Sequence, residues 1–107
     1  MFVRNLAIHL KPNSLAEFTR IFDKEVLPML RKQTGFQDEI AFSTSPTGTD
    51  LVAISLWDTQ EHAEAYSTTA YPEVLKSLNG VLDGDPKVRV SDVITSTIHS
   101  TSAVAAG

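Results

Sequence analysis

The first ten residues alternate between two sets of side chains with a period of two, which predicts a β-strand. One set is apolar and the other is mixed: Phe2, Leu6, Ile8 and Leu10 against Val3, Asn5, Ala7 and His9. The residues Lys11-Pro12-Asn13 are expected to end the strand, because proline has no backbone N–H to donate to a neighbouring strand.

A helical period follows and predicts a helix near residues 14 to 33. Ser14 and Glu17 have the S-x-x-E spacing of a capping box. Apolar residues then recur every three or four positions: Leu15, Phe18, Phe22, Val26, Met29 and Leu30. Pro28 lies inside this pattern and is expected to kink or split the helix, because it removes one backbone hydrogen bond. Gly35 is expected to follow directly after the helix C-terminus.

Two further strands are predicted at residues 36–45 and 51–57, separated by a cluster of turn-forming residues. In the first of them, two sets of residues alternate and are expected on opposite faces of the strand: Phe36, Ile40 and Phe42 on one face, and Gln37, Glu39 and Ser43 on the other. Because the link between the two strands is short, they are expected to pair as an antiparallel hairpin.

Helical spacing returns over residues 59 to 82, with a break expected near Tyr71-Pro72 because proline favours the first turn of a helix. Asp58 or Thr59 is expected to cap this region. The β-branched segment over residues 87–100 then predicts a long final strand, and residues 101–107 are expected to form a flexible tail.

The order of elements is therefore β-α-β-β-α-β within one domain, residues 1–100. The economical packing for this order is a ferredoxin-like α+β sandwich, in which both helical regions cover one face of a four-stranded antiparallel sheet. The other face is apolar enough to need a cover as well. A second copy of the chain, reached by the long final strand, is the simplest cover and predicts a homodimer.

Composition narrows the classes of function. The chain has 107 residues, a net charge of -4 and nine Lys and Arg residues that form no run, which argues against a nucleic-acid partner. It has no cysteine, so disulfides and thiolate metal sites are excluded. No apolar run is long enough to span a membrane, and the N-terminus lacks the pattern of a signal peptide. A cytoplasmic location is the expectation.

Two motifs carry a resemblance to a known family. Residues 28–36 read P-M-L-R-K-Q-T-G-F, and the third predicted strand ends in L-W followed by D-T-Q-E-H-A-E-A-Y. Over roughly residues 2 to 98, the chain resembles the antibiotic biosynthesis monooxygenase family. The resemblance implies a dimeric α/β barrel made of two ferredoxin-like chains with their sheets face to face. It also implies the activities of the family: cofactor-independent oxygenation of quinols and aromatic polyketides, or haem degradation.

The haem-degrading branch of this superfamily provides a test. It uses an Asn in the first strand, a Trp at the end of the helix after the third strand and a His ligand ten positions later. Asn5 matches the first position, but Tyr66 takes the place of the Trp and Lys76 that of the His. A protonated Lys is a poor replacement for imidazole as an iron ligand, so haem degradation is the least favoured function.

Six residues are candidates for a site that binds a small aromatic or quinol-like ligand. Asn5, Trp57 and Tyr66 are assigned to catalysis, and His9, Phe42 and Tyr71 to substrate contact. Five of them have a structural alternative: for Asn5 a side chain that meets water, for Trp57 a core anchor, for His9 a solvent-facing or interface position, and for the two tyrosines a buried ring with its hydroxyl in water. For Trp57 the packing role is favoured.

The base in such a reaction is left open by the sequence. His9 and His99 are the plausible bases by residue type but belong to neither motif, and His62 is expected to be exposed. The segment E-H-A-E at residues 61–64 lacks the spacing of a zinc motif, so no metal site is expected. The leading hypothesis is a monooxygenase that needs neither metal nor flavin, and the alternative is a non-catalytic ligand-binding dimer.

Overall fold

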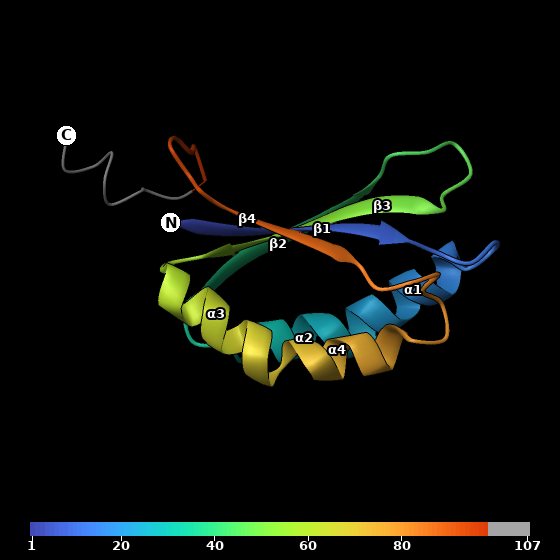
Figure 1. Cartoon of the computed structure of the whole chain (residues 1–107), viewed down its shortest axis with the longest axis horizontal. Coiled ribbons are helices and arrows are strands. Elements are labelled where there is room, and N and C mark those ends of the chain that lie inside the picture. The colour runs from blue at the N-terminus through green and yellow to red at the C-terminus, as the bar shows by residue number, and fades with distance from the viewer. Residues whose placement is uncertain (99–107) are drawn as a thin grey trace.

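A computed structural model of the chain describes residues 1–98. Four strands form one sheet: β1 (Phe2–His9), β2 (Phe36–Ser43), β3 (Asp50–Trp57) and β4 (Lys87–Asp92). The strand order is β2-β3-β1-β4, and every neighbouring pair is antiparallel. All helices lie on one face of this sheet (Figure 1). The predicted ferredoxin-like α+β fold is confirmed.

The first helical region is continuous but not uniform. It consists of α1 (Leu15–Ile21), a π-helical turn η1 (Phe22–Val26) and α2 (Leu27–Arg31). In η1 the N–H of Leu27 donates to the carbonyl of Phe22, five residues earlier. Pro28 explains this turn, because its ring has no N–H and would collide with the carbonyl four residues before it in an α-helix. The predicted kink therefore takes the form of a wider turn just before the proline.

Two expected helix ends differ from prediction. Ser14 is the N-cap of α1 but makes no capping bond with its side chain, and Glu17 pairs with Arg20 instead of closing a capping box. Gly35 does not follow the helix directly, because α2 already ends at Arg31. Gly35 does have the positive φ expected of such a glycine, +84°. A side chain there would collide with Asp58, so the glycine of the first motif allows a close approach to the second.

The second helical region is broken as predicted. It consists of α3 (Gln60–Thr69) and α4 (Tyr71–Leu78), joined at Ala70. The Thr59 side chain caps α3 by accepting a hydrogen bond from the N–H of His62. Among the described residues, no helix is both long and apolar enough to cross a bilayer.

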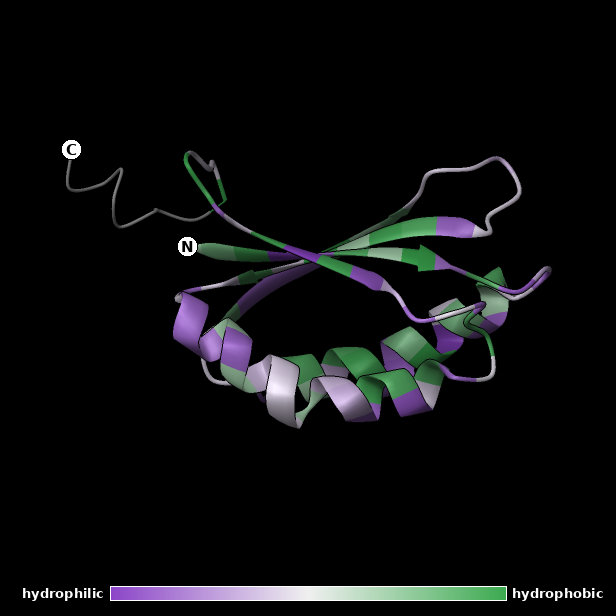
Figure 2. Ribbon diagram, viewed as in Figure 1, coloured by the Kyte–Doolittle hydropathy of each residue, from purple (hydrophilic) through white to green (hydrophobic). Residues whose placement is uncertain are grey.

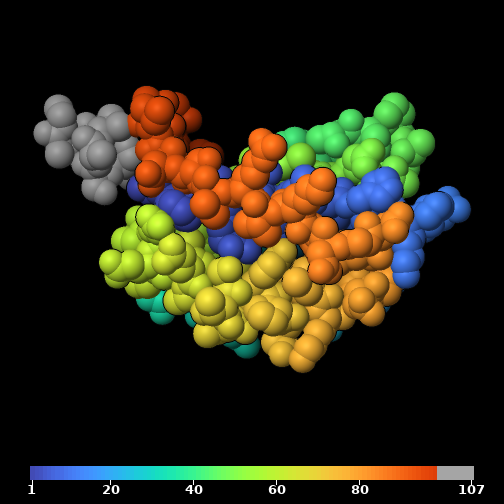
Figure 3. All heavy atoms as spheres, in the orientation of Figure 1, coloured from blue at the N-terminus to red at the C-terminus, as the bar shows by residue number. Residues whose placement is uncertain are grey.

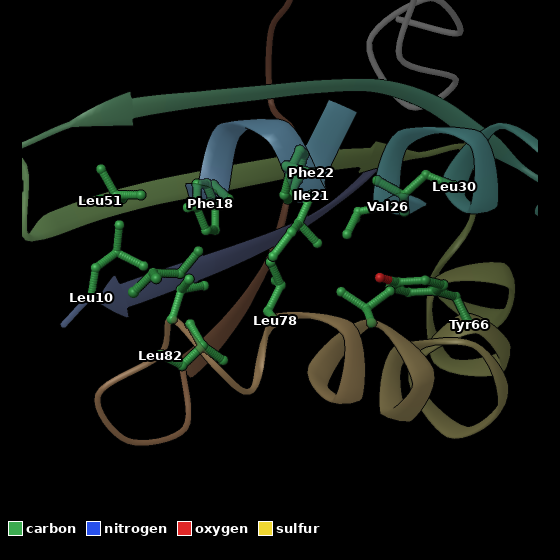
Figure 4. Close-up of a cluster of buried hydrophobic side chains, with 14 of the residues drawn as sticks. Leu10, Phe18, Ile21, Phe22, Val26, Leu30, Leu51, Tyr66, Leu78 and Leu82 are labelled. Carbon is green, nitrogen blue, oxygen red and sulfur yellow. The ribbon is translucent and has the colours of Figure 1, made fainter. Parts of the chain in front are cut away.

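The core fills the space between the sheet and the helices. Hydrophobic segments of the helices face the strands in Figure 2, and Figure 4 shows side chains from both layers meeting in this space. The buried apolar residues of β1 and β3 are those whose side chains point towards the helices: Phe2, Ile8, Leu51, Ala53 and Trp57. Phe2 and Ile8, two members of the apolar set of the first strand, therefore lie on the inner face.

The predicted alternation of β2 holds from Glu39 to Ser43, but the prediction that Phe36 shares a face with Ile40 and Phe42 is wrong. A β-bulge between Phe36 and Asp38 shifts the register against β3. As a consequence, Phe36 packs inward against Trp57, whereas Ile40 and Phe42 lie on the outer face. Glu39 is opposite the buried Ser55 and takes the inward position.

The final strand is shorter than predicted. β4 ends at Asp92, opposite Phe2, and the N–H of Val93 makes one more bond to the carbonyl of Met1. β4 pairs only with β1 and runs antiparallel to it, so it ends where β1 begins. Residues 93–98 continue without regular structure, and the tail predicted at residues 101–107 lies outside the described residues.

The outer face of the sheet is not covered by helices. In Figure 3 the helices fill the side below the strands, whereas the opposite side carries the β2–β3 turn at one end and residues 93–98 at the other. Ile40 and Phe42 are 59% and 45% exposed on this face, and Ile94 and Ile98 are also exposed.

Candidate functional site

Three polar residues form a row across the inner face of the sheet. Arg4 of β1 lies opposite Ser55 of β3, and Ser55 lies opposite Glu39 of β2. Because residues that face each other across a ladder share a face, all three side chains point towards the helices. A cation and a carboxylate therefore stand two strands apart, with a hydroxyl between them, inside an otherwise apolar layer.

This row borders a narrow cavity between the sheet and the helices. Its walls are the inner residues of the strands, the π-turn with α2, and the helices α3 and α4: Arg4, Leu6, Ile8, Glu39, Ala53, Ser55, Phe22, Val26, Leu30, Tyr66, Tyr71, Val74, Leu75 and Leu78. The cavity volume is about 30 Å³, room for about one water molecule. An aromatic ligand can enter only if some of these side chains move.

Arg4 is a buried cation, only 3% exposed. Its guanidinium lies over the rings of Tyr71 and Tyr66, 4.7 Å and 5.3 Å from their centroids. Such cation–π contacts offset part of the cost of burial. Nε and Nη2 nevertheless have no hydrogen-bond partner among the described residues, and burial lowers the pKa of Arg4. Arg4 thus presents unused N–H donors in a site with little water.

Glu39 is the carboxylate at the other end of the row. Its Oε1 is buried and has no hydrogen-bond partner among the described residues. Burial, with a smaller contribution from the negative charge of Asp23, raises the pKa of Glu39 to about 7. A general base is most effective when its pKa lies near the working pH, and Glu39 meets this condition.

Two tyrosines form the wall next to Arg4. Tyr66 is buried, and Figure 4 shows its ring within the core below Val26 and Leu30. The hydroxyl of Tyr71 is buried and has no hydrogen-bond partner among the described residues. Burial raises the pKa of both phenols, so both remain protonated at neutral pH and can donate hydrogen bonds.

Trp57 supports this wall from behind. It is fully buried, lies outside the cavity lining and stacks on Tyr66 with ring centroids 4.9 Å apart. Its indole N–H donates to the Ser55 hydroxyl over 2.9 Å. Since Ser55 accepts this bond, its own O–H is available as a donor next to the cavity. The packing role favoured for Trp57 matches this position.

The six candidates from the sequence do not come together. Tyr66 and Tyr71 line the cavity and Trp57 lies behind them. Asn5 and His9 have the opposite parity to Arg4 in β1 and therefore point to the outer face. Phe42 also lies on that face, at the border of a surface groove next to β2. The roles assigned to these residues stay predictions.

The remaining candidates from the sequence lie away from the cavity. His9 is exposed and binds Asp50 over 2.6 Å. His62 is half-exposed and binds Asp58 over 2.7 Å, at the junction with Gly35. Lys76, the counterpart of the haem ligand, is exposed on α4 and pairs with Glu73. His99 lies outside the described residues, and within residues 1–98 no group of three potential metal ligands occurs.

Arg4 and Glu39 were missed by the sequence reasoning. For Arg4 a signal was present, because it has the same parity as Phe2, Leu6 and Ile8 and so shares their inward face. A charged residue at such a position is rarely buried without a reason. For Glu39 there was no comparable signal, because the β-bulge that turns it inward has no mark in the sequence.

A groove on the surface adjoins the cavity. It runs between α1 with η1 and the edge strand β2, and its lining includes Phe22 and Glu39, which also line the cavity. Asp23 lies in the same groove. Movement of Phe22 and Glu39 would therefore join the two spaces and give a ligand access from the surface.

Comparison with known proteins places the chain in a family. The sequence model described as antibiotic biosynthesis monooxygenase matches residues 1–75. None of the curated proteins compared with the chain matches it.

Several solved structures share the fold. A putative antibiotic biosynthesis monooxygenase from Nitrosomonas europaea superimposes with a TM-score of 0.72 at 14% identity, over 89% of this chain and 100% of that one. A monooxygenase from Streptomyces coelicolor, in complex with nanaomycin D, gives 0.73 at 17% identity over 92% of both chains. SnoaB, a cofactor-independent oxygenase from Streptomyces nogalater, gives 0.65 at 17% identity over 92% of this chain and 95% of that one.

Proposed function

The chain belongs to the antibiotic biosynthesis monooxygenase family, and we propose that it is a cofactor-independent monooxygenase of a quinol or an aromatic polyketide-like small molecule. The observation that carries the proposal is the pair of buried, unpaired groups at the two ends of one apolar cavity, Arg4 and Glu39. Two structural neighbours support the class of reaction: SnoaB is described as a cofactor-independent oxygenase, and the Streptomyces coelicolor monooxygenase holds nanaomycin D.

The proposed first step is proton removal. Glu39, in its ionised form, takes a proton from an O–H or an activated CH₂ group of the substrate and becomes neutral. Arg4 then offsets the negative charge of the substrate anion, with Ser55 and Tyr71 as further donors. One donor of this kind typically contributes about 2.7–4 kcal/mol when it is aimed at developing charge.

The anion can then react with oxygen without a cofactor. It passes one electron to O₂, and the two radicals combine through a new C–O bond to a peroxide anion. The peroxide takes the proton back from Glu39. Loss of water from the hydroperoxide then converts the carbon that carries it, a ring C–H of a quinol or the CH₂ of an anthrone, to C=O. One oxygen atom enters the product and the other leaves as water, so the substrate supplies all four electrons. The narrow, apolar cavity limits the access of bulk water to the intermediates.

Oxygen consumption with a panel of quinols and anthrones, without added metal or flavin, tests this function. Glu39→Gln is expected to lower turnover by about 10²–10⁴, the usual contribution of a general base. Glu25→Gln makes the same chemical change on the exposed side of η1 and should leave turnover unchanged. Product formed under ¹⁸O₂ should contain one labelled atom.

If wild type turns over no substrate of the panel, the alternative of a ligand-binding protein without catalysis takes its place. If Glu39→Gln is as active as wild type, the proposed reaction still stands but Glu39 is not its base.

We also propose a homodimer through the outer face of the sheet. Ile40 and Phe42 are exposed there, next to the apolar Val52, Ile54 and Leu56 of β3. Burial of such a patch against a second copy would remove it from water. Light scattering at micromolar concentration is expected to give twice the mass of one chain, 11.7 kDa. A monomer mass would exclude this assembly.

A further inference from the structure

Arg4 and Glu39 do not neutralise each other, although they share one cavity. They stand on β1 and β2, which are separated by β3, so their backbones lie two strand spacings apart, about 10 Å. Each has buried polar atoms without a hydrogen-bond partner among the described residues. A ligand between them therefore meets a base at one end and a cation at the other.

This separation sets a condition on the ligand. When Glu39 takes a proton from the ligand, the end of the ligand next to Glu39 becomes negatively charged. The carboxyl group beside that charge has just become neutral and cannot stabilise it. An apolar cavity destabilises charge that has no partner. The charge is stabilised by Arg4 only if it can move through the ligand to the other end. Conjugation between the acidic group and a distant acceptor oxygen provides that movement.

We propose that the substrate is a vinylogous acid, a conjugated hydroxycarbonyl compound whose hydroxyl meets Glu39 and whose carbonyl oxygen meets Arg4. The inference rests on the proposed function and specifies the substrate of the same site. Before ionisation, the carbonyl accepts a hydrogen bond from Arg4. After ionisation, the same oxygen carries much of the negative charge, so the interaction strengthens as the anion forms.

The other walls fit a flat ligand held in this direction. Tyr66 and Tyr71 lie beside Arg4, whereas Val26 and Leu30 belong to the helical region that faces them. The narrow cavity of about 30 Å³ has to widen for any aromatic ring. Phe22 and Glu39 separate it from the groove next to β2, which places the access route at the end occupied by the base.

The test compares two isomeric ligands in the absence of O₂. In 4-hydroxybenzaldehyde the phenolate charge reaches the carbonyl oxygen by conjugation, and in 3-hydroxybenzaldehyde it does not. Each compound is titrated with wild-type protein under argon, and the phenolate absorption band is followed against pH. For the para isomer, binding is expected to raise the ionisation constant about 10- to 1000-fold, the range expected for an opposite charge close by. For the meta isomer the change should be at least tenfold smaller.

Variants assign the effect to Arg4. Arg4→Met should remove the difference between the isomers, and Arg4→Lys should keep part of it because the charge remains. Arg31→Met is the matched control, since Arg31 is exposed at the end of α2 and lines neither the cavity nor the outer face of the sheet. If Arg4→Met does not fold, the comparison of the two isomers on wild type and on Arg4→Lys still tests whether their difference depends on Arg4.

Equal behaviour of the two isomers, or failure of both to bind, overturns the proposal. The readout needs no turnover, so it separates this proposal from the proposed function. If the protein ionises the para isomer selectively but consumes no oxygen, the proposed ligand class stands and the proposed oxygenase function fails. A protein that oxidises quinols but treats the isomers alike keeps the reaction and loses the ligand class.

Discussion

The space between sheet and helices contains two regions of opposite character. The apolar end is built from Leu10, Phe18, Ile21, Leu51 and Leu82, all buried (Figure 4). The polar end is built from Arg4, Ser55, Glu39, Tyr66 and Tyr71. The apolar end stabilises the fold by removing side chains from water. The polar end keeps donors and an acceptor buried without partners, each at a cost of about 1–3 kcal/mol.

The difference shows where stability has been given up. Both ends share the same strands, since β1 carries Arg4 near its start and leads into Leu10 after its end. An apolar residue at the position of Arg4 would satisfy the packing and remove the orphaned donors. Retention of a buried cation in a domain of this size points to a ligand that supplies what the protein leaves unpaired.

The largest effect that we expect is a loss of stability from a substitution at the apolar end, and it tests the contrast between the two ends. Leu10 is 1% exposed, so Leu10→Ala removes packed atoms and leaves a cavity. It is expected to lower the free energy of unfolding by about 2–5 kcal/mol. Urea denaturation measures this loss, while turnover per folded molecule should stay near that of wild type. A loss below about 1 kcal/mol would show that this end does not carry the stability assigned to it.

At the polar end the corresponding effect depends on pH. Glu39 has a pKa of about 7 in the folded chain, raised from 4.5 by burial, so the folded state holds its proton more tightly than the unfolded state. The resulting stabilisation is complete below pH 4.5 and is lost as the pH rises through 7, by at most about 3 kcal/mol. Turnover should change in the opposite direction, because only ionised Glu39 acts as the base.

Parallel measurements of unfolding and turnover between pH 5 and pH 8 check this opposition. The charged groups that face Glu39 are Asp23 across the groove and Arg4 across the cavity. In Glu39→Gln the part of the pH dependence of stability that comes from this carboxyl should disappear. A stability profile identical to that of wild type would mean that the carboxyl is solvated in the folded chain.

The smallest expected effect concerns Asp23, the exposed neighbour in the groove. Its negative charge contributes to the raised pKa of Glu39 after burial itself. Asp23→Asn should therefore move the rise of turnover to lower pH by less than about one unit, since solvent screens exposed charges. The plateau rate and the unfolding free energy should barely change. A shift to higher pH would contradict the assigned sign.

The sequence was sufficient for the apolar end and insufficient for the polar one. Periodicity grouped Phe2 and Ile8 in one apolar set, and both are buried. The predicted helical stripe is buried at Phe18 and Val26, whereas Leu15 at its start is exposed. The site depends instead on the register between strands that are distant in sequence. Arg4 and Glu39 lie in one row only because each is paired with Ser55 on the strand between them. A bulge near Phe36 decides which side of β2 faces inward, and such a bulge follows from pairing rather than from local residue preference.

The π-helical turn has a consequence for how this chain should be aligned with others. An α-helix turns by about 100° per residue, and a π turn fits one additional residue into nearly the same length. Between Phe22 and Leu27 the chain is therefore one residue longer than a regular helix would require. A relative with an unbroken α-helix here should show a one-residue gap opposite residues 22–26. That gap keeps Phe18 and Leu30 each in phase with its counterpart, whereas an ungapped alignment would pair cavity-lining residues with solvent-facing ones.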